Sequence, residues 1–295
     1  MLAPVVLGGI AAGATVFVAT IVAVFFLLQH GGSFERMRHE ATGLPTTGDD
    51  LKPLLYDELL VKARAMALQP APLGAAAPLK GECVRIRDFK GEKEDFAALF
   101  RISNGEPREG IYREIKYDAD DMIWKFLDVG PFDTQQQLKV HLTQQQSDSR
   151  HFVLVEPESS APIGMITLSA HAPRDLRVQI DSLWLTPAFQ GGPVATETVL
   201  LLLTHLFESV GYRRVEWRCD GHNVRARRAA HSLGFSFEGV LRKHRIVKDC
   251  NCDSVMFAAI NSEWPMTKEH LERKLHARKQ TVDATDTAED KKKTR

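Results

Sequence analysis

The stretch that decides the fold runs from Asp181 to Gly239 and reads DSLWLTPAFQGGPVATETVLLLLTHLFESVGYRRVEWRCDGHNVRARRAAHSLGFSFEG. Its pattern predicts a strand, a glycine turn at Gly191 and Gly192 that opens a helix, a second strand, and a second helix after Asn223. In such a βαβ unit, free backbone N–H groups and the helix dipole converge at the glycine turn. The stretch therefore predicts a site for a phosphate-bearing ligand.

Two kinds of nucleotide site lack their signature in this stretch. The glycine turn is followed neither by Lys-Ser/Thr, as in a P-loop, nor by the further glycine of a dinucleotide fingerprint. A nucleotide-binding protein is therefore a disfavoured alternative, and the ligand is expected to be neither a P-loop nucleotide nor NAD.

Length and composition narrow the class of protein. The 295 residues suffice for one generous domain or two small ones. Lys+Arg and Asp+Glu number 38 each, so no global field favours nucleic acid, and no nucleic-acid partner is expected. The four cysteines suggest reduced thiols rather than a disulfide framework. Cys250-x-Cys252 has no second Cys/His pair at ligand spacing, so we expect no metal.

The N-terminal segment predicts a membrane anchor. The first 34 residues contain no Asp, Glu, Lys or Arg, and Ala3 to Leu28 is almost wholly apolar. At about 1.5 Å per residue, such a helix crosses a bilayer of roughly 30 Å. A cleaved signal peptide typically has a basic n-region and a shorter apolar core. We therefore expect a transmembrane anchor over residues 1–30. Arg36, Arg38 and Lys52 follow it, which places the remainder in the cytosol.

The rest of the chain divides into three parts. Residues 31–80 are predicted to form a juxtamembrane linker with a short amphipathic helix over Leu51–Leu68. Residues 81–265 are predicted to form the globular domain. Residues 266–295 are expected to form a basic amphipathic helix and a disordered tail. Within the domain, strands are expected at 83–89, 151–156, 163–170, 177–185 and 254–260, and helices at 92–103 and 134–146.

Several ordered motifs in the chain resemble one family. Gln190-Gly191-Gly192-Pro193-Val194-Ala195 is similar to the pyrophosphate loop Gln/Arg-x-x-Gly-x-Gly/Ala of the GNAT acyltransferases. Arg214 to Asp220, then Asn223 and Leu233-Gly234-Phe235, resemble the motifs of the RimJ/RimL branch. Ile123-Trp124-Lys125-Phe126 and Gly130-Pro131-Phe132 match its aromatic and Gly-Pro-Phe segment. That branch acetylates protein N-termini or small amines with acetyl-CoA, and the resemblance covers about Gly81 to Pro265.

The resemblance implies a fold and a cofactor site. The fold class is α/β (α+β), with helices around a mixed central sheet and a V-shaped splay between two parallel strands, Leu183–Leu185 and Val215–Cys219. Acetyl-CoA would be the co-substrate, with its pantetheine along the first strand and its pyrophosphate on the amides of the loop. The implied cofactor-binding residues are Leu183, Trp184, Leu185, Gln190, Gly191, Gly192, Pro193, Val194, Ala195, Asn223 and Arg228.

Two carboxylates are candidates for the catalytic base. In the implied direct attack of an amine on the thioester, a base must take a proton from the ammonium. Asp181 stands in an apolar run, two positions from Gln179 and so on the same strand face. A structural carboxylate is the alternative for Asp181. Glu216 is the second candidate, with a salt bridge to Arg218 or Arg242 as its structural alternative. Cys219 is expected to pack rather than to act as a nucleophile.

Departures from the family pattern leave a second hypothesis open. The branch's serine three residues after the motif Asn corresponds to Ala226, Gln179 stands where an acidic residue is common, and Pro193 removes one loop amide. The alternative is therefore a catalytically weakened acetyl-CoA-binding or scaffold protein. An enzyme would transfer acetyl to a protein N-terminal α-amino group or a small amine, with the acceptor site formed by residues within Arg101–Gly130.

Overall fold

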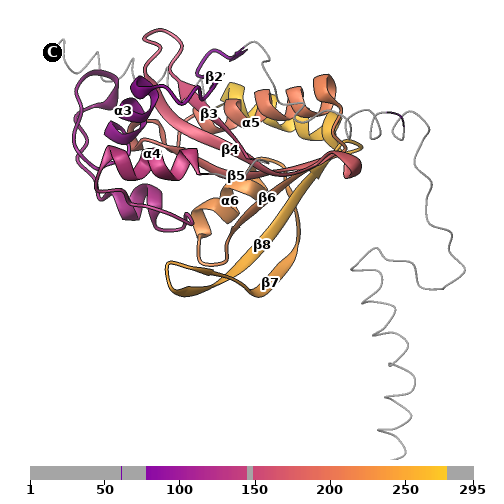
Figure 1. The fold of residues 1–295 in the computed structure, drawn as a ribbon. Coiled ribbons are helices and arrows are strands. Elements are labelled where there is room, and N and C mark those ends of the chain that lie inside the picture. The colour runs from indigo at the N-terminus through magenta and orange to yellow at the C-terminus, as the bar shows by residue number, and fades with distance from the viewer. Residues whose placement is uncertain (1–60, 62–77, 145–148, 278–295) are drawn as a thin grey trace, which may run out of the picture. The chain divides into compact units, whose positions relative to one another are not determined.

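The computed structural model describes residues 61, 78–144 and 149–277. Its centre is a mixed eight-stranded sheet in the order β1-β2-β3-β4-β5-β6-β8-β7 (Figure 1). Only β5 and β6 pair in parallel; the other neighbours are antiparallel. The strands are β1 (Leu79–Lys80), β2 (Arg85–Asp88), β3 (Arg150–Val155), β4 (Pro162–Ala172), β5 (Arg177–Leu185), β6 (Arg214–Asp220), β7 (Ser236–Val247) and β8 (Cys250–Ile260).

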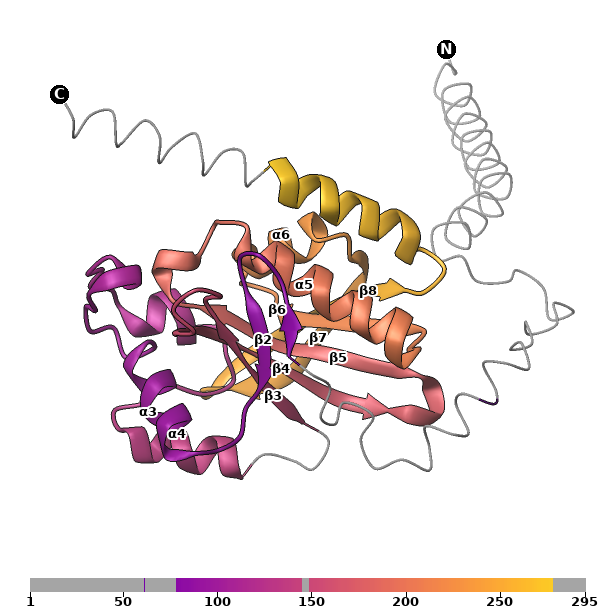
Figure 2. The same ribbon diagram turned by 90° about the horizontal axis from the view of Figure 1, so that it is seen from above.

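Helices cover both faces of the sheet and bury two apolar clusters. The larger cluster holds side chains of α5 (Val194–Thr204), α6 (Val224–Ser232) and helix 264–277. The second cluster lies under α3 (Lys93–Arg101), α4 (Gln135–Thr143) and the turn η2 (Asp120–Trp124). Figures 1 and 2 both show helix 264–277 beside α5. The remaining short helices are the 3-10 helices η1 (Gly110–Tyr112), η3 (Pro173–Asp175) and η4 (Pro187–Phe189), and the π-helix η5 (His205–Val210), which continues α5.

Local sequence accounts for most of these elements. At the start of α4, the Thr134 hydroxyl accepts the Gln137 N–H at 3.2 Å and the Gln137 side chain accepts the Thr134 N–H at 3.3 Å, which is a capping box. The predicted hairpin is confirmed, since β3 and β4 pair antiparallel from Arg150 and Leu168 to Val155 and Pro162. The predicted mixed sheet and its flanking helices are thus present.

Strand β7 was not predicted. It lies at an edge of the sheet, and nine of its twelve residues are exposed, with basic residues concentrated in its second half. A strand with neither face buried shows no period-two alternation, so the usual signal is missing. Its partner β8 begins at Cys250, four residues before the expected start at Ser254.

The structured domain extends beyond both predicted boundaries. Leu79 and Lys80, assigned to the linker, form β1 and pair with β2. Helix 264–277 buries Trp264, Leu271 and Leu275, and Leu271 belongs to the larger cluster. This segment, expected from residue 266 as a basic amphipathic helix, is helical as far as residue 277 and completes the core.

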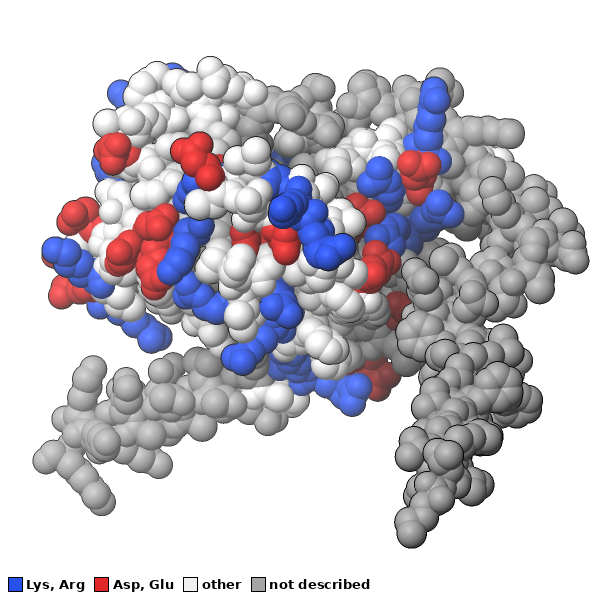
Figure 3. Space-filling view, turned by 90° about the horizontal axis from the view of Figure 1, so that it is seen from below, with Lys and Arg blue, Asp and Glu red and all other residues white. Residues whose placement is uncertain are grey.

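Other predictions fall on residues that the structure does not describe. These are the span over 1–30, the Leu51–Leu68 helix apart from Val61, and the tail 278–295. Within the described ranges, no helix has both the length and the apolarity needed to cross a membrane. On the face shown in Figure 3, acidic and basic side chains lie interspersed.

Candidate active site

The site lies where the two parallel strands part. Pairing between β5 and β6 begins at Arg177 and Arg214 and ends at Ile180 and Trp217. Beyond that point β5 stays with β4 as far as Leu185, whereas β6 stays with β8. The expected V-shaped splay is confirmed, and it leaves the edge of β5 after Ile180 without a strand partner on the β6 side.

A bulge in β5 sets the position of Asp181. Thr167 of β4 pairs with Ser182, and the next residue, Leu168, pairs with Ile180, so Asp181 is the extra residue. Such bulges redirect a side chain and are frequent beside active sites. Asp181 Oδ1 accepts hydrogen bonds from Arg218 Nη2 at 2.9 Å and from Gln179 Nε2 at 3.1 Å.

The glycine turn leads into the first turn of α5. Gly191 has φ +75°, which favours glycine, and an added Cβ would meet nothing within 4 Å. Pro193 is the N-cap residue with φ −72°, and its carbonyl accepts the Glu197 N–H at 2.9 Å. The N–H groups of Val194 and Ala195 therefore belong to the set that has no acceptor within the helix. Together with the helix dipole they form a site suited to an anion.

Gln190 differs from its expected role. Its N–H donates to the Pro187 carbonyl at 3.1 Å and is not available to a phosphate. Its side chain donates to the carbonyls of Leu185 at 2.8 Å and Met122 at 3.3 Å. Gln190 therefore ties the glycine turn to the end of β5 and to η2. The amide that sequence reasoning assigned to pyrophosphate here is already bonded.

A buried carboxylate that the sequence analysis did not identify supports α5. Glu197 accepts the N–H groups of Cys83 at 2.6 Å, Val84 at 2.9 Å and Glu82 at 3.0 Å. It is 4% exposed. The start of α5 is thereby joined to the turn between β1 and β2.

The start of α6 forms the other wall of the opening. Asn223 accepts the Ala226 N–H at 2.9 Å, so its expected capping role is confirmed. Arg225 Nη2 donates to the Asp121 carbonyl at 2.6 Å and spans from α6 to η2. Arg228 is exposed and does not line the cavity described next, so the structure does not bring this predicted residue to the site.

Between these walls lies a cavity of about 220 Å³, which we call the glycine-turn cavity. Seven of the predicted cofactor residues line it, whereas Gly192, Pro193 and Val194 lie in the adjoining turn and helix start. Its lining residues on β5, the glycine turn, β6 and α6 are Leu183, Trp184, Leu185, Gln190, Gly191, Ala195, Trp217, Asn223, Arg225, Ala226, Ala229 and Leu233, and residues of 121–127 complete it.

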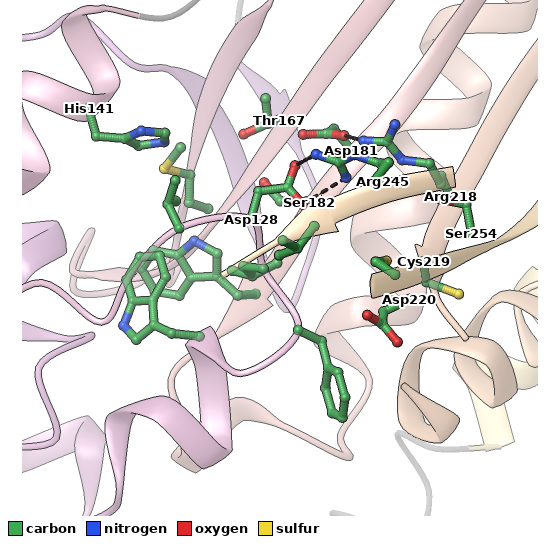
Figure 4. A pocket seen from close by; sticks show the side chains of 18 of the residues that line it. Asp128, His141, Thr167, Asp181, Ser182, Arg218, Cys219, Asp220, Arg245 and Ser254 are labelled. Carbon is green, nitrogen blue, oxygen red and sulfur yellow. Dashed lines mark hydrogen bonds and ion pairs between the residues drawn. The ribbon is translucent and has the colours of Figure 1, made fainter. Parts of the chain in front are cut away.

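A second cavity of about 140 Å³, the aspartate cavity, shares the walls Phe126, Leu127 and Trp184 with the first. It opens toward a wider polar groove. Besides Cys219 and Cys252, the charged and titratable side chains along the cavity are Asp128, His141, Asp181, Arg218, Asp220 and Arg245 (Figure 4).

The charged side chains of the aspartate cavity form its polar rim, and two ion pairs join four of them. Arg218 pairs with Asp181, and Arg245 pairs with both oxygens of Asp128, at 2.7 Å for the Nη1–Oδ1 contact. Asp220 accepts a backbone N–H from His222 at 2.7 Å. With three aspartates and two arginines, the rim carries one excess negative charge when His141 is neutral.

Burial keeps the remaining titratable groups neutral. Desolvation lowers the pKa of His141, and Asp128 only partly opposes this effect. Desolvation is also the largest cause that raises the pKa of the Cys219 and Cys252 thiols to about 11. Because the thiolate is the nucleophile, neither cysteine is suited to covalent catalysis at neutral pH.

Glu216 does not reach either cavity. It accepts from Arg214 Nε at 2.8 Å and from Arg177 Nη1 at 3.3 Å. Glu216 therefore forms a salt bridge, as predicted, but the predicted partners Arg218 and Arg242 were wrong. Parallel pairing sets Arg177 beside Arg214, and both arginines lie on the Glu216 face of the sheet.

Most residues of the aspartate cavity were missed as site residues, among them Asp128, Asp220 and Arg245. Asp128 lies within the expected acceptor segment 101–130, so its region was indicated but not its carboxylate. Asp220 ends a predicted strand and was assigned no role. Arg245 comes from β7, which the pattern did not reveal.

Comparison with known proteins agrees with this geometry. Residues 84–236 match the family model described as Acetyltransferase (GNAT) domain. A GCN5-related N-acetyltransferase from Brucella melitensis has 29% identity and a TM-score of 0.61, over 69% of this chain and 87% of that chain. A GNAT-family protein from Chromobacterium violaceum has 29% identity and a TM-score of 0.60, over 75% and 100%. The comparison with curated proteins gives no match.

A more distant structure shares the fold. It is an acetyltransferase from Salmonella typhimurium that modifies the N-terminal serine of the ribosomal protein L7/L12, with 17% identity and a TM-score of 0.51, over 62% and 99%. The mixed sheet, the splay and the glycine turn define an acyltransferase of the acetyl-CoA-using type. The chain belongs to the GNAT acetyltransferase family.

Proposed function

We propose that the protein binds acetyl-CoA in the glycine-turn cavity and transfers its acetyl group to an amine in the aspartate cavity. The observation that carries this proposal is the meeting of the two cavities at Trp184, where β5 leaves β6. A thioester can enter from one side and an amine from the other. Direct transfer then needs no nucleophile from the protein.

The residues fit the cofactor. The edge of β5 at Leu183 has no strand partner on the β6 side, which suits the amides of pantetheine. The N–H groups of Val194 and Ala195 have no acceptor within α5, and Gly191 borders open space, which suits pyrophosphate. Gly192 and Pro193 shape this turn. Asn223 and Arg225 of α6, which line the cavity, are the proposed contacts on the other wall.

We propose Asp181 as the group that takes the proton from the acceptor's ammonium, directly or through water. Arg218 and Gln179 both bind Oδ1 and so fix the carboxylate. The second oxygen can then face the cavity. Glu216, the second sequence candidate, would act only through the arrangement of β6. The deprotonated amine attacks the thioester carbonyl carbon, and the C–S bond breaks as the CoA thiolate leaves.

For the acceptor we propose a protein N-terminal α-amino group or a small amine. The relative from Salmonella typhimurium acts on an N-terminal serine, which supports this class by analogy of fold alone. The excess negative charge of the rim suits one ammonium group.

The test is acetyl-CoA turnover by the full chain with a panel of N-terminal peptides and small amines, read as CoA release. Acetyl-CoA binding is measured in parallel by calorimetry. Release that requires an acceptor supports the proposal. Binding without release would favour the alternative of a weakened acetyl-CoA-binding or scaffold protein, suggested by Ala226, Gln179 and Pro193.

We further propose that residues 1–30 anchor the protein in a membrane with the acetyltransferase domain facing the cytosol. Support comes from the uncharged apolar sequence and from Arg36, Arg38 and Lys52 after it. The full chain should float with membranes after alkaline carbonate extraction, and a variant lacking residues 1–30 should not. Release of the full chain by carbonate would reject an anchor.

A further inference from the structure

The aspartate cavity has an apolar floor beneath its charged rim. Leu138 and Leu142 come from α4, Met165 from β4, and Trp124 and Trp184 close the sides. Each of these five side chains is at most 7% exposed, and all belong to one apolar cluster. An amine at the splay would therefore have charged groups on one side and apolar carbon on the other.

We infer that the acceptor carries, next to its amine, an apolar group of about four to six carbon atoms that fills this floor. This rests on the proposed function and adds the chemical class of the acceptor. The cavity measures about 140 Å³. An apolar protein cavity of about 150 Å³ accepts a molecule the size of benzene, which sets the size of the group.

The charges of the cavity exclude other acceptors. One ammonium neutralises the single excess negative charge of the rim, so a second, as in a polyamine, would leave the rim with an excess positive charge or would lie unpaired on the floor. An acidic group on the floor would also lack a partner there, because His141 is neutral and both arginines already bind aspartates. One ammonium with an apolar neighbour satisfies both parts of the cavity.

Helix α4 provides a matched pair of positions for a test. Leu142 lines the cavity and is 7% exposed, whereas Val140, two residues earlier, is 39% exposed and does not line it. The two residues lie on different sides of one helix. Enlarging Leu142 should fill the floor, and enlarging Val140 should place the added atoms in solvent.

The experiment measures kcat/KM of the full chain with acetyl-CoA for peptides that differ only in the first residue: Leu, Phe, Gly, Ser or Asp. Leucinamide, isoamylamine and spermidine complete the panel. We expect at least a tenfold preference for Leu over Gly and Asp, since each methylene in an apolar pocket is worth roughly ten- to 200-fold. Comparison of the leucine peptide, leucinamide and isoamylamine separates a peptide acceptor from a small amine.

Variants at Leu142 and Val140 test whether the floor of the aspartate cavity determines the acceptor preference. Leu142→Phe should lower kcat/KM for the leucine peptide about tenfold while sparing the glycine peptide. Leu142→Ala should shift the preference toward Phe, and Val140→Phe should leave the profile unchanged. Acetyl-CoA affinity and the thermal midpoint serve as controls for folding. A flat profile, a preference for Asp or spermidine, or equal loss for all acceptors in Leu142→Phe would overturn the inference.

A binding measurement separates this inference from the proposed function. Trp124 and Trp184 line the cavity, so their fluorescence can report binding of an amine there. In the presence of CoA, the dissociation constant measured in this way should be at least tenfold lower for leucinamide than for glycinamide. Turnover with the wrong selectivity refutes the inference alone. Absence of turnover with selective leucinamide binding refutes the proposed reaction alone, and equal binding of both amides refutes the inference.

Discussion

Arg218 on β6 donates a 2.9 Å hydrogen bond to Asp181 on β5, just beyond the point where the two parallel strands separate. The pair bridges the mouth of the V from one strand to the other. It exists because a bulge makes Asp181 the unpaired residue of β5. A local irregularity of one strand therefore determines where a charged group lies in the site.

Asp181→Asn should lower kcat/KM for the acceptor by about 100-fold, because an amide cannot take the ammonium proton. Acetyl-CoA affinity should stay within about twofold, since Asp181 does not line the glycine-turn cavity. Steady-state kinetics and calorimetry measure the two quantities. Asp175→Asn, at a carboxylate with 59% of its side chain exposed, is the control. An unchanged rate would remove Asp181 from the reaction.

Gly191→Ala should weaken acetyl-CoA binding by about tenfold. An alanine at φ +75° costs roughly 1–2 kcal/mol, although its Cβ meets no neighbour. Gly192→Ala, at the next position, has ordinary φ and equally open space, so its effect should be much smaller. Calorimetric titration of both variants tests this order. Equal losses would show that added bulk, and not backbone strain, controls the turn.

Ala226→Ser should raise kcat severalfold if protonation of the CoA thiolate limits turnover, because a hydroxyl can donate where a methyl group cannot. Ala226 lines the glycine-turn cavity one turn into α6. Stopped assays of CoA release measure the effect. Val224→Ser, on the exposed side of the same helix turn, is the matched control. No gain would indicate that the thiolate leaves unaided or receives a proton elsewhere.

Removal of His151 should reduce the loss of stability in acid. Burial lowers the pKa of His151 to about 4, whereas an unfolded histidine titrates near 6.5. Below pH 6.5 His151 is protonated in the unfolded chain but stays neutral in the folded chain. The free energy of unfolding therefore decreases as the pH is lowered from about 6.5 to about 4. His151→Gln should diminish the difference between pH 7.5 and pH 5 by about 2 kcal/mol in urea titrations.

The control for this pH dependence is His222→Gln, since the His222 side chain is 81% exposed. Its pH profile should match that of the unmodified chain. A parallel shift of the His151→Gln curve at every pH would mean that the lost Thr167 contact, and not titration, causes the change.

Glu197→Ala should destabilise the fold by roughly 3 kcal/mol, because it leaves three N–H groups of the β1–β2 turn without their acceptor. Thermal or chemical unfolding measures the loss. Glu269→Ala, at a carboxylate paired with Arg273 and with 71% of its side chain exposed, should cost much less. Similar losses for both would contradict a special role for the buried carboxylate.

The sequence predicted those parts of the site that depend on neighbours along the chain. The capping Asn223, the glycine turn before α5 and the two parallel strands follow from local pattern, and the structure contains them. The edge strand β7 escaped prediction because neither of its faces is buried. Arg245 was missed with it, since a residue on an unrecognised strand cannot be assigned to a site.

The sequence by itself determined the family, the order of the elements from β3 to α6 and the place of the glycine turn, because these depend on residue types at fixed short spacings. Only the tertiary structure decided which charges meet. Arg218 pairs with Asp181, Arg245 with Asp128, and Glu216 with Arg177 and Arg214. These partners are 2 to 117 residues apart. Strand register, the bulge at Asp181 and the return of β7 bring them together, and none of these can be read from residue spacing.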